Sequence, residues 1–171
     1  DKVEFYQTLQ VVNDKSINVN DMANVKDINE VDLLYNLWNR LKEKKTFTNV
    51  GPTLLIVNPF TRIEGVYNDE VLEHFIEKQE REPPETRQCI DEPHLYDLVL
   101  IAIKELLKPN SKNQALVISG ESGAGKTEAA KNCMECITHY FTKLAGGSKS
   151  DSNDIPLERK ILNCNPILEA F

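Results

Sequence analysis

The sequence has no long hydrophobic run, no large basic region and only three histidines, and each of these features narrows the class of protein. None of its apolar stretches approaches the length of a membrane span, and the N-terminal DKVEFYQTLQ lacks the pattern of a signal peptide. The formal net charge of −7 argues against a broad surface for nucleic acid or anionic membranes, because both require clustered Lys and Arg. We therefore expect no nucleic-acid partner and no membrane contact by these 171 residues.

The four cysteines do not show the spacing of a disulfide framework or of a complete metal site. Only Cys133 and Cys136 have C-x-x-C spacing, no second pair follows, and the histidines are scattered. We interpret Cys133 and Cys136 as small apolar residues on a helix, in a protein of a reducing compartment. A redox or metal-binding role for the pair is the alternative.

The spacing of apolar residues indicates an α/β protein with a sizeable core. Residues 1–29 are polar and weakly patterned, and we expect an extended or irregular arm. One apolar helix face, of the kind that packs against a core, is predicted by Val31, Leu34, Leu37, Trp38 and Leu41. Helices are predicted over residues 31–41, about 93–108, about 125–144 and about 157–164. A further helix is predicted to begin at residues 68–69 and to end before residue 83.

Runs of apolar residues predict two buried strands. Residues 53–57 and 115–119 are too uniformly apolar for exposed edge strands, so we expect both faces of each to be covered. Residues 46–50 predict a further short strand before the turn at Gly51-Pro52. Because about three strands make a poor centre for a doubly covered sheet, we expect an incomplete mixed sheet flanked by helices, with further strands beyond Phe171.

A glycine-rich turn follows the second of these predicted strands. The sequence GESGAGKT over residues 120–127 matches the P-loop pattern G-x-x-x-x-G-K-[ST]. Its three glycines permit the backbone angles with which successive amides form an anion site, and the following helix adds its positive end. Lys126 supplies a cation for the terminal phosphates, and Thr127 supplies a hydroxyl for Mg²⁺. We therefore predict nucleoside triphosphate binding; the alternative is a glycine-rich turn without a ligand.

Hydrolysis of a triphosphate needs more than this turn. An acidic residue near the metal, commonly at the end of a second buried strand, and a group that positions the attacking water are also required. After Lys126 the sequence has no four-residue apolar run ending in Asp, no D-x-x-G and no N-K-x-D, so a small-GTPase reading fails. We expect the 171 residues alone to turn over ATP poorly. An unrelated P-loop ATPase or kinase, and a module that binds ATP as a structural or regulatory ligand, are the alternatives.

The turn and its surroundings resemble the motor (head) domain of the myosins. Residues typical of this family's P-loop are Glu121-Ser122 before Gly123 and Glu128 after Thr127. Further similar stretches are DLLYNL from Asp32, GPTLLIVNPF from Gly51, PHLY from Pro93, NQ at 113–114, and LE at 157–158 through NPILEAF at 165–171. The similarity covers roughly residues 28–171, which we take as the N-terminal part of a motor domain, whereas residues 1–27 form a weakly matched arm.

This resemblance implies a P-loop NTPase-type core that holds ATP and Mg²⁺. It implies that Lys126 acts catalytically on the terminal phosphate and that Thr127 binds Mg²⁺. Tyr67 lies farther from the Asn-Pro pair than the usual family tyrosine, and the residues alone also fit a strand stop at Asn58-Pro59 and a packing role for Tyr67. The implied nucleotide contacts are Gly120, Glu121, Ser122, Gly123, Ala124, Gly125, Lys126, Thr127 and Glu128, with Asn58, Pro59, Phe60, Arg62 and Tyr67 on the adenine side.

The resemblance also implies an actin-dependent, ATP-driven motor of the cytoplasm and cytoskeleton. Actin would bind through other parts of the motor, and light chains or calmodulin through a lever arm. Switch I and switch II, on which hydrolysis depends, are expected beyond Phe171. Residues 146–154 stand where myosins have a surface loop linked to ADP release, although their composition alone describes a solvated linker. We expect residues 145–154 to be poorly ordered.

Overall fold

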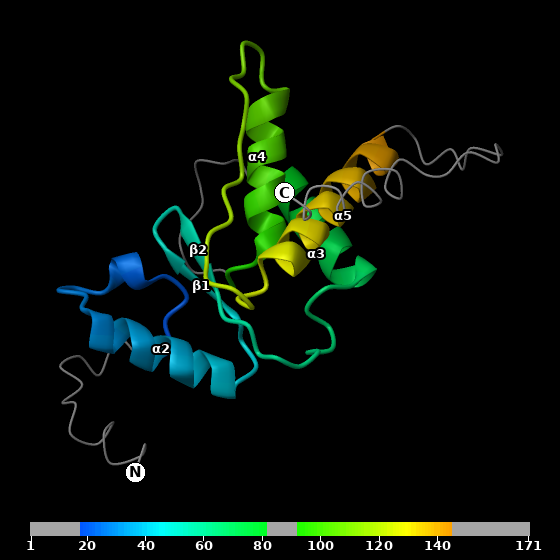
Figure 1. Cartoon of the computed structure of the whole chain (residues 1–171). Helices are drawn as coiled ribbons and strands as arrows, with labels where there is room; N and C mark the ends of the chain where they lie inside the picture. The colour runs from blue at the N-terminus through cyan, green and yellow to red at the C-terminus, as the bar shows by residue number, and fades with distance from the viewer. Residues whose placement is uncertain (1–17, 82–91, 145–171) are drawn as a thin grey trace. The chain divides into compact units, whose positions relative to one another are not determined.

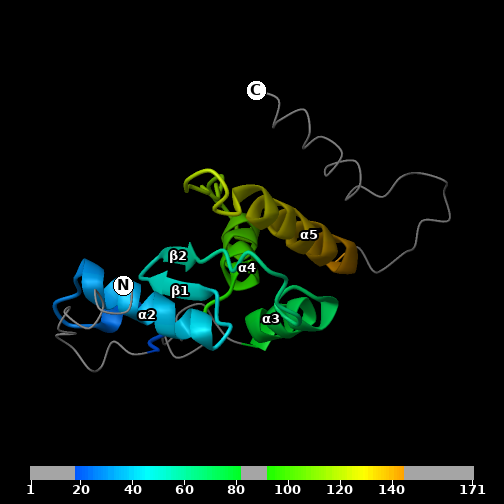
Figure 2. The same ribbon diagram turned by 60° about the horizontal axis from the view of Figure 1, so that its bottom comes forward.

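The structure of the chain is a computed structural model that describes residues 18–81 and 92–144 (Figures 1 and 2). The described residues fall into two compact units, the first comprising 18–64 with 92–94 and the second 65–81 with 95–144. The predictions for the arm before residue 18, for the segment 145–154 and for a helix over 157–164 lie outside the described residues. Within the described ranges, no helix combines the length and the apolar character that a membrane crossing requires.

The first unit contains one long helix, a short 3-10 helix and a β-hairpin. Its elements are η2 (Met22–Asn24), α2 (Glu30–Lys42), β1 (Phe47–Val50) and β2 (Thr53–Ile56). The two strands pair antiparallel, with Phe47 opposite Ile56. Gly51 turns the hairpin with a φ of +58°, and its amide donates to Asp21 Oδ1 at 3.0 Å. These bounds confirm the helix and the short strand that were predicted for this region.

Helix α2 buries its polar side chains rather than its apolar ones. Leu34 and Trp38, two members of the predicted apolar face, are 62% and 54% exposed. Asn36 is fully buried, since its side chain accepts from Val19 N at 2.7 Å and donates to Val19 O at 3.0 Å. The other fully buried positions of the helix are Asp32 and Arg40. The prediction that the apolar face packs against the core is therefore wrong in this unit, because hydrogen bonds to polar side chains determine which face is covered.

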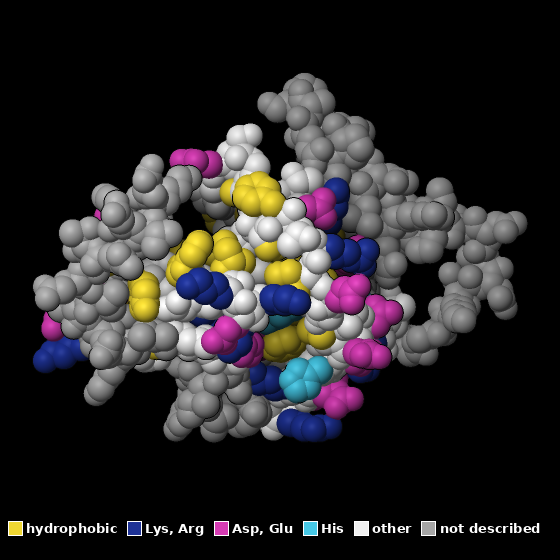
Figure 3. Space-filling model, turned by 90° about the horizontal axis from the view of Figure 1, so that it is seen from below, with side chains coloured by type: hydrophobic (Ala, Val, Ile, Leu, Met, Phe, Trp, Pro, Cys, Tyr) yellow, Lys and Arg dark blue, Asp and Glu magenta, His cyan; other side chains and the backbone are white. Residues whose placement is uncertain are grey.

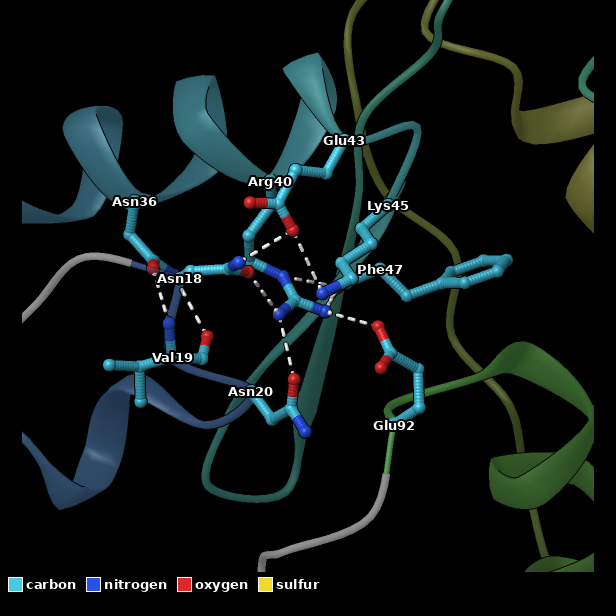
Figure 4. Close-up of polar contacts among 9 residues, drawn as sticks. All are labelled: Asn18, Val19, Asn20, Asn36, Arg40, Glu43, Lys45, Phe47 and Glu92. Carbon is cyan, nitrogen blue, oxygen red and sulfur yellow. Dashed lines mark hydrogen bonds and ion pairs between the residues drawn. The ribbon is translucent and has the colours of Figure 1, made fainter.

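Arg40 is the centre of the buried polar contacts in the first unit (Figure 4). Its Nε and Nη2 both donate to Phe47 O, at 3.0 and 2.8 Å, and its Nη1 donates to Asn20 Oδ1 at 2.7 Å. Nη2 also pairs with Glu92 Oε1 at 3.1 Å. Burial lowers the pKa of Arg40, whereas Glu92 and Glu43 oppose that shift. The guanidinium thus joins α2 to β1 and to the segment that precedes η2.

The second unit is helical and consists of α3 (Asp69–Arg81), α4 (Leu95–Leu107) and α5 (Lys126–Leu144). Helix α4 contacts both α3 and α5 (Figures 1 and 2). Helix α3 begins as predicted, since Asn68 Oδ1 accepts from Val71 N at 2.8 Å. The buried apolar side chains are Leu72, Phe75, Ile76, Leu95, Tyr96, Val99, Leu100, Ile103, Ala129, Cys133 and Cys136. The three predicted helices are confirmed, and so is the reading of Cys133 and Cys136 as apolar residues on a helix, because both thiols are free and buried.

The strand predicted over residues 115–119 is wrong. Residues 111–121 form neither helix nor strand, and Val117 is 90% exposed. A strand needs a neighbour that satisfies its backbone hydrogen bonds, and neither described strand pairs with this segment. The strand predicted over 53–57 is confirmed as β2, but its side chains are exposed or half-buried, so the expected cover on both faces is wrong. In place of the expected mixed sheet, the described residues form a two-stranded antiparallel sheet.

Candidate functional site

The predicted P-loop connects the segment 111–121 to α5. Gly123 and Gly125 have φ angles of +78° and +96°, which lie in the left-handed region that favours glycine. Ala124 N donates to Glu121 O at 3.2 Å and closes a turn in the loop. Two of the three glycines thus adopt backbone angles that a side chain would disfavour, while the anion site stays a prediction.

Lys126, at the first position of α5, folds back onto this loop. Its exposed Nζ donates to Gly120 O at 2.9 Å and to Glu121 O at 2.8 Å. A Cβ on Gly120 would lie 3.1 Å from the Cβ of Ala124, a close contact to which the loop would have to adjust by a few tenths of an ångström. Lys126 is itself the first residue of α5, and the first amides of a helix have no acceptor within it. The cation of Lys126 and the glycine-rich backbone of the loop thus occur together at the start of α5.

The side chains that follow Lys126 are open to solvent. Thr127 and Glu128 are both exposed in the first turn of α5. Glu128 Oε1 pairs with Lys131 Nζ at 3.0 Å, so its carboxylate is partly neutralised by its own helix. In the part of the chain that the structure describes, no group of three or more His, Cys, Asp or Glu residues is arranged to hold a metal ion.

Residues 58–62, which the resemblance assigns to the adenine side, follow β2 in the first unit. Asn58 Oδ1 accepts from Phe60 N at 2.9 Å and closes a short turn after Pro59. Phe60 has a φ of +51° and is 86% exposed, and Arg62 is exposed as well. A non-glycine residue with a left-handed backbone is uncommon, and such outliers cluster at functional sites. The pair Asn58-Pro59 thus follows the end of a strand and also presents an aromatic ring to solvent.

Tyr67 belongs to the second unit, as does the P-loop. Its ring meets the ring of Tyr96 edge-on, with 5.6 Å between the centroids. Burial raises the pKa of Tyr67 above its ordinary value, and Tyr96 and Cys133 add to the shift. The packing contact that was the alternative for Tyr67 is present, while its adenine contact stays a prediction. The structure places Tyr67 in one unit with residues 120–128, whereas residues 58–62 belong to the other.

The sequence analysis missed a charged cluster that links α3 to α5. Glu73 Oε1 lies 2.8 Å from His139 Nε2, and Glu73 Oε2 pairs with Lys143 Nζ. Hydrogen bonds from Lys143 and His139 lower the pKa of Glu73, and the bond to Glu73 raises the pKa of Lys143. The sequence signal is the four-residue spacing of His139 and Lys143 together with the acid-rich α3, and both features are common on exposed helices.

Charges of both signs are interspersed on the described surface. Figure 3 shows Lys and Arg side chains in dark blue among Asp and Glu side chains in magenta on the face that it draws. Several of them pair within one helix, such as Arg81 with Glu77 at 2.8 Å. Exposed pairs of this kind contribute about 0–1 kcal/mol each to stability.

Comparison with known proteins defines the class to which this chain belongs. The family model described as myosin head (motor domain) matches residues 19–171. The chain is 39% identical over 158 residues to the high molecular weight form of myosin-1 of Acanthamoeba castellanii, covering 92% of this chain and 9% of that protein. It is 36% identical over 159 residues to the myosin IC heavy chain of Dictyostelium discoideum, which covers 92% of this chain and 12% of that protein. It is 36% identical over 167 residues to myosin-51 of Schizosaccharomyces pombe, which covers 97% of this chain and 10% of that protein.

These matches confirm the resemblance, and the chain belongs to the myosin head (motor domain) family. The chain spans about a tenth of the length of these relatives, between 9% and 12%.

Proposed function

We propose that the chain forms the nucleotide-holding part of an actin-based, ATP-driven motor. The observation that carries the proposal is the glycine loop over residues 120–125, closed by Lys126 at the start of the 19-residue helix α5. Membership of the myosin head family favours this function over an unrelated P-loop ATPase or kinase.

In this proposal the phosphates bind to the loop amides and to Lys126. A glycine at position 120, where a Cβ would be crowded, lets an anion approach the main chain closely. The ammonium group now bonds two neutral carbonyls, and it is exposed and able to exchange them for phosphate oxygens. Charge-assisted bonds to phosphate are stronger than bonds to neutral carbonyls, so the exchange is favourable. Lys126 would then neutralise charge on the terminal phosphate, which is its proposed catalytic role.

The same loop fits a magnesium ion that is bound with the nucleotide. Magnesium keeps several waters and takes one or two protein oxygens together with phosphate oxygens. The exposed Thr127 hydroxyl lies in the turn of helix next to Lys126, and it is the group that would hold the ion. When bound, magnesium neutralises negative charge on the phosphates. The remaining residues of the range 120–128 complete the proposed contact surface.

We assign the adenine side of the site to residues 58–62 and to Tyr67. The exposed Phe60 ring offers an apolar face to a planar base, and Asn58 and Arg62 supply polar groups beside it. Tyr67 offers a phenol whose ring is already fixed against Tyr96.

The activities of the whole protein are assigned to the longer polypeptide. Because the chain spans about a tenth of its relatives, we propose that switch I, switch II, the actin-binding surface and the lever arm lie outside these residues. The intact protein would bind actin filaments, would bind light chains or calmodulin at its lever arm, and would act in the cytoplasm on the cytoskeleton.

Steady-state phosphate release by the full-length protein in MgATP, measured with and without actin filaments, tests this function. For a motor we expect a low basal rate of phosphate release, which rises severalfold with actin concentration and then saturates. A protein that binds MgATP but whose phosphate release is unaffected by actin would contradict the motor and favour a regulatory ATP-binding module.

A further inference from the structure

Glu73 of α3 is shared by a histidine and a lysine of α5. His139 Nε2 approaches one carboxylate oxygen at 2.8 Å and Lys143 Nζ pairs with the other, so both oxygens have a partner on the same helix. His139 and Lys143 are four residues apart and therefore lie on one helix face. The three side chains are about one-third exposed, between 32% and 42%. We call Glu73, His139 and Lys143 the α3–α5 clamp.

The clamp connects two helices that each have a proposed nucleotide contact at or just before their first residue. Helix α5 begins with Lys126, which closes the P-loop. Helix α3 follows Tyr67, and Tyr67 packs edge-on against Tyr96 of α4. Helix α4 contacts both α3 and α5, so the three helices form one packed set. A bond between α3 and α5 therefore acts within the same compact unit that contains Lys126 and Tyr67.

We propose that Glu73 is a positioning residue, which holds α3 against α5 and so fixes Tyr67 relative to the P-loop when nucleotide is bound. The inference rests on the proposed nucleotide site. Glu73 does not touch the loop itself, because its partners His139 and Lys143 lie in the last turns of the 19-residue α5. Its effect is transmitted by the relative placement of two helices.

The electrostatics of the clamp agree with this geometry. Lys143 and His139 lower the pKa of Glu73, so the carboxylate is ionised and acts as the acceptor of both bonds. Lys143 also faces Glu77 and Glu80 of α3, which raise its pKa further after Glu73. Loss of the Glu73 charge removes the acceptor that both α5 side chains share, while the apolar contacts of α4 with each helix stay in place.

The consequence is a faster release of nucleotide when the clamp is broken. A partly exposed pair that is worth up to about 1 kcal/mol changes a rate constant by about two- to fivefold. Glu73→Gln keeps the size of the side chain and removes its charge. Glu105→Gln is the matched control, because Glu105 pairs at 2.5 Å with Lys108, which follows the same helix α4.

The test measures two quantities on the full-length protein. Dissociation of magnesium mant-ADP, chased with excess MgATP in a stopped-flow instrument, reports the nucleotide site. Hydrogen exchange of the backbone amides of residues 136–144, without nucleotide, reports the clamp itself. We expect Glu73→Gln to release mant-ADP about two- to fivefold faster and to exchange faster over these residues. We expect Glu105→Gln to match the wild type in both measurements.

A charge exchange separates positioning from general stability. The double variant Glu73→Lys with Lys143→Glu restores an opposite-charge pair across the helices. We expect it to release mant-ADP more slowly than either single variant but still faster than the wild type, because the carboxylate at position 143 then faces Glu77 and Glu80. A wild-type protein that binds mant-ADP, together with a Glu73→Gln variant that releases it at the wild-type rate, would overturn this inference alone. A wild-type protein that does not bind mant-ADP would overturn the proposed function and this inference with it.

Discussion

The ammonium group of Lys126 is held by the carbonyl oxygen of Gly120, with 2.9 Å between Nζ and O. The bond spans the predicted P-loop from its first glycine to the first residue of α5. A lysine at this place is within reach of the glycine backbone on which a phosphate would lie, and it is exposed. This relationship puts a cation beside the loop that we propose as the phosphate site.

The backbone of Gly123 provides a first prediction. Its φ is +78° and a Cβ there would meet nothing within 4 Å, so Gly123→Ala adds backbone strain without a steric clash. We expect the free energy of unfolding to fall by about 1 kcal/mol, because an L side chain disfavours this conformation. We also expect the affinity of the full-length protein for MgATP to fall, because the strained loop moves away from the anion-binding conformation.

Gly65 offers a matched control for that variant. Its φ is +77° and an added Cβ would likewise meet nothing within 4 Å, but it lies outside the loop. We expect Gly65→Ala to lose as much free energy of unfolding as Gly123→Ala, measured by urea denaturation. Its affinity for MgATP, measured by equilibrium titration, should be unchanged. Equal affinities for both variants would separate the loop conformation from nucleotide binding and refute the assignment.

Replacement of Arg40 is expected to destabilise the first unit strongly. The variant Arg40→Leu removes the buried bonds of the guanidinium to Phe47 O and its part-buried bond to Asn20 Oδ1, and we expect the free energy of unfolding to fall by about 3 kcal/mol. Arg81→Leu serves as the control, because the Arg81 side chain is 77% exposed and should change stability by less than about 0.5 kcal/mol. Urea denaturation followed by circular dichroism measures both, and similar midpoints for the two variants would disprove the role of Arg40.

The α3–α5 clamp predicts a pH dependence of stability. The pKa of Glu73 is lowered in the folded state, so its contribution is present above the ordinary value of 4.5 and is lost as the pH falls through the folded value. The pKa of Lys143 is raised, so its contribution is present below the ordinary value of 10.5 and is lost as the pH rises through the folded value. Between these limits we expect the free energy of unfolding of the wild type to exceed that of Glu73→Gln by up to about 1 kcal/mol.

Unfolding free energies at a series of pH values measure this difference directly. We expect the difference between wild type and Glu73→Gln to shrink below pH 4.5 and above pH 10.5. A difference that stayed constant down to pH 2.5 would show that the charge of Glu73 contributes nothing.

Helices and the glycine loop were predictable from the sequence because their signals are local. The apolar spacing of α3, α4 and α5, the cap at Asn68 and the pattern over 120–127 each depend on neighbouring residues. These elements appear where they were predicted, and Gly123 and Gly125 have the expected backbone freedom.

Features that depend on distant partners were not predictable in the same way. The apolar run 115–119 predicts a buried strand, yet it is mostly exposed and forms no strand, because a strand needs a neighbour that the described residues do not provide. Helix α2 shows an apolar face in the sequence, but the bonds of Asn36 to Val19 and of Arg40 to Phe47 bury the opposite one. The same limit applies to Glu73, whose partners are 66 and 70 positions away.

The binding of a non-hydrolysable MgATP analogue to the full-length protein, measured by isothermal calorimetry, tests the central assignment most directly. Lys126→Ala removes the cation that closes the loop, and Lys112→Ala removes an equal charge from the exposed segment before it. We expect the wild type and Lys112→Ala to bind the analogue equally well and Lys126→Ala to bind it about a hundredfold more weakly, because a charge-assisted phosphate contact is lost. An equal affinity for all three proteins would contradict the assignment of residues 120–127 as the phosphate site.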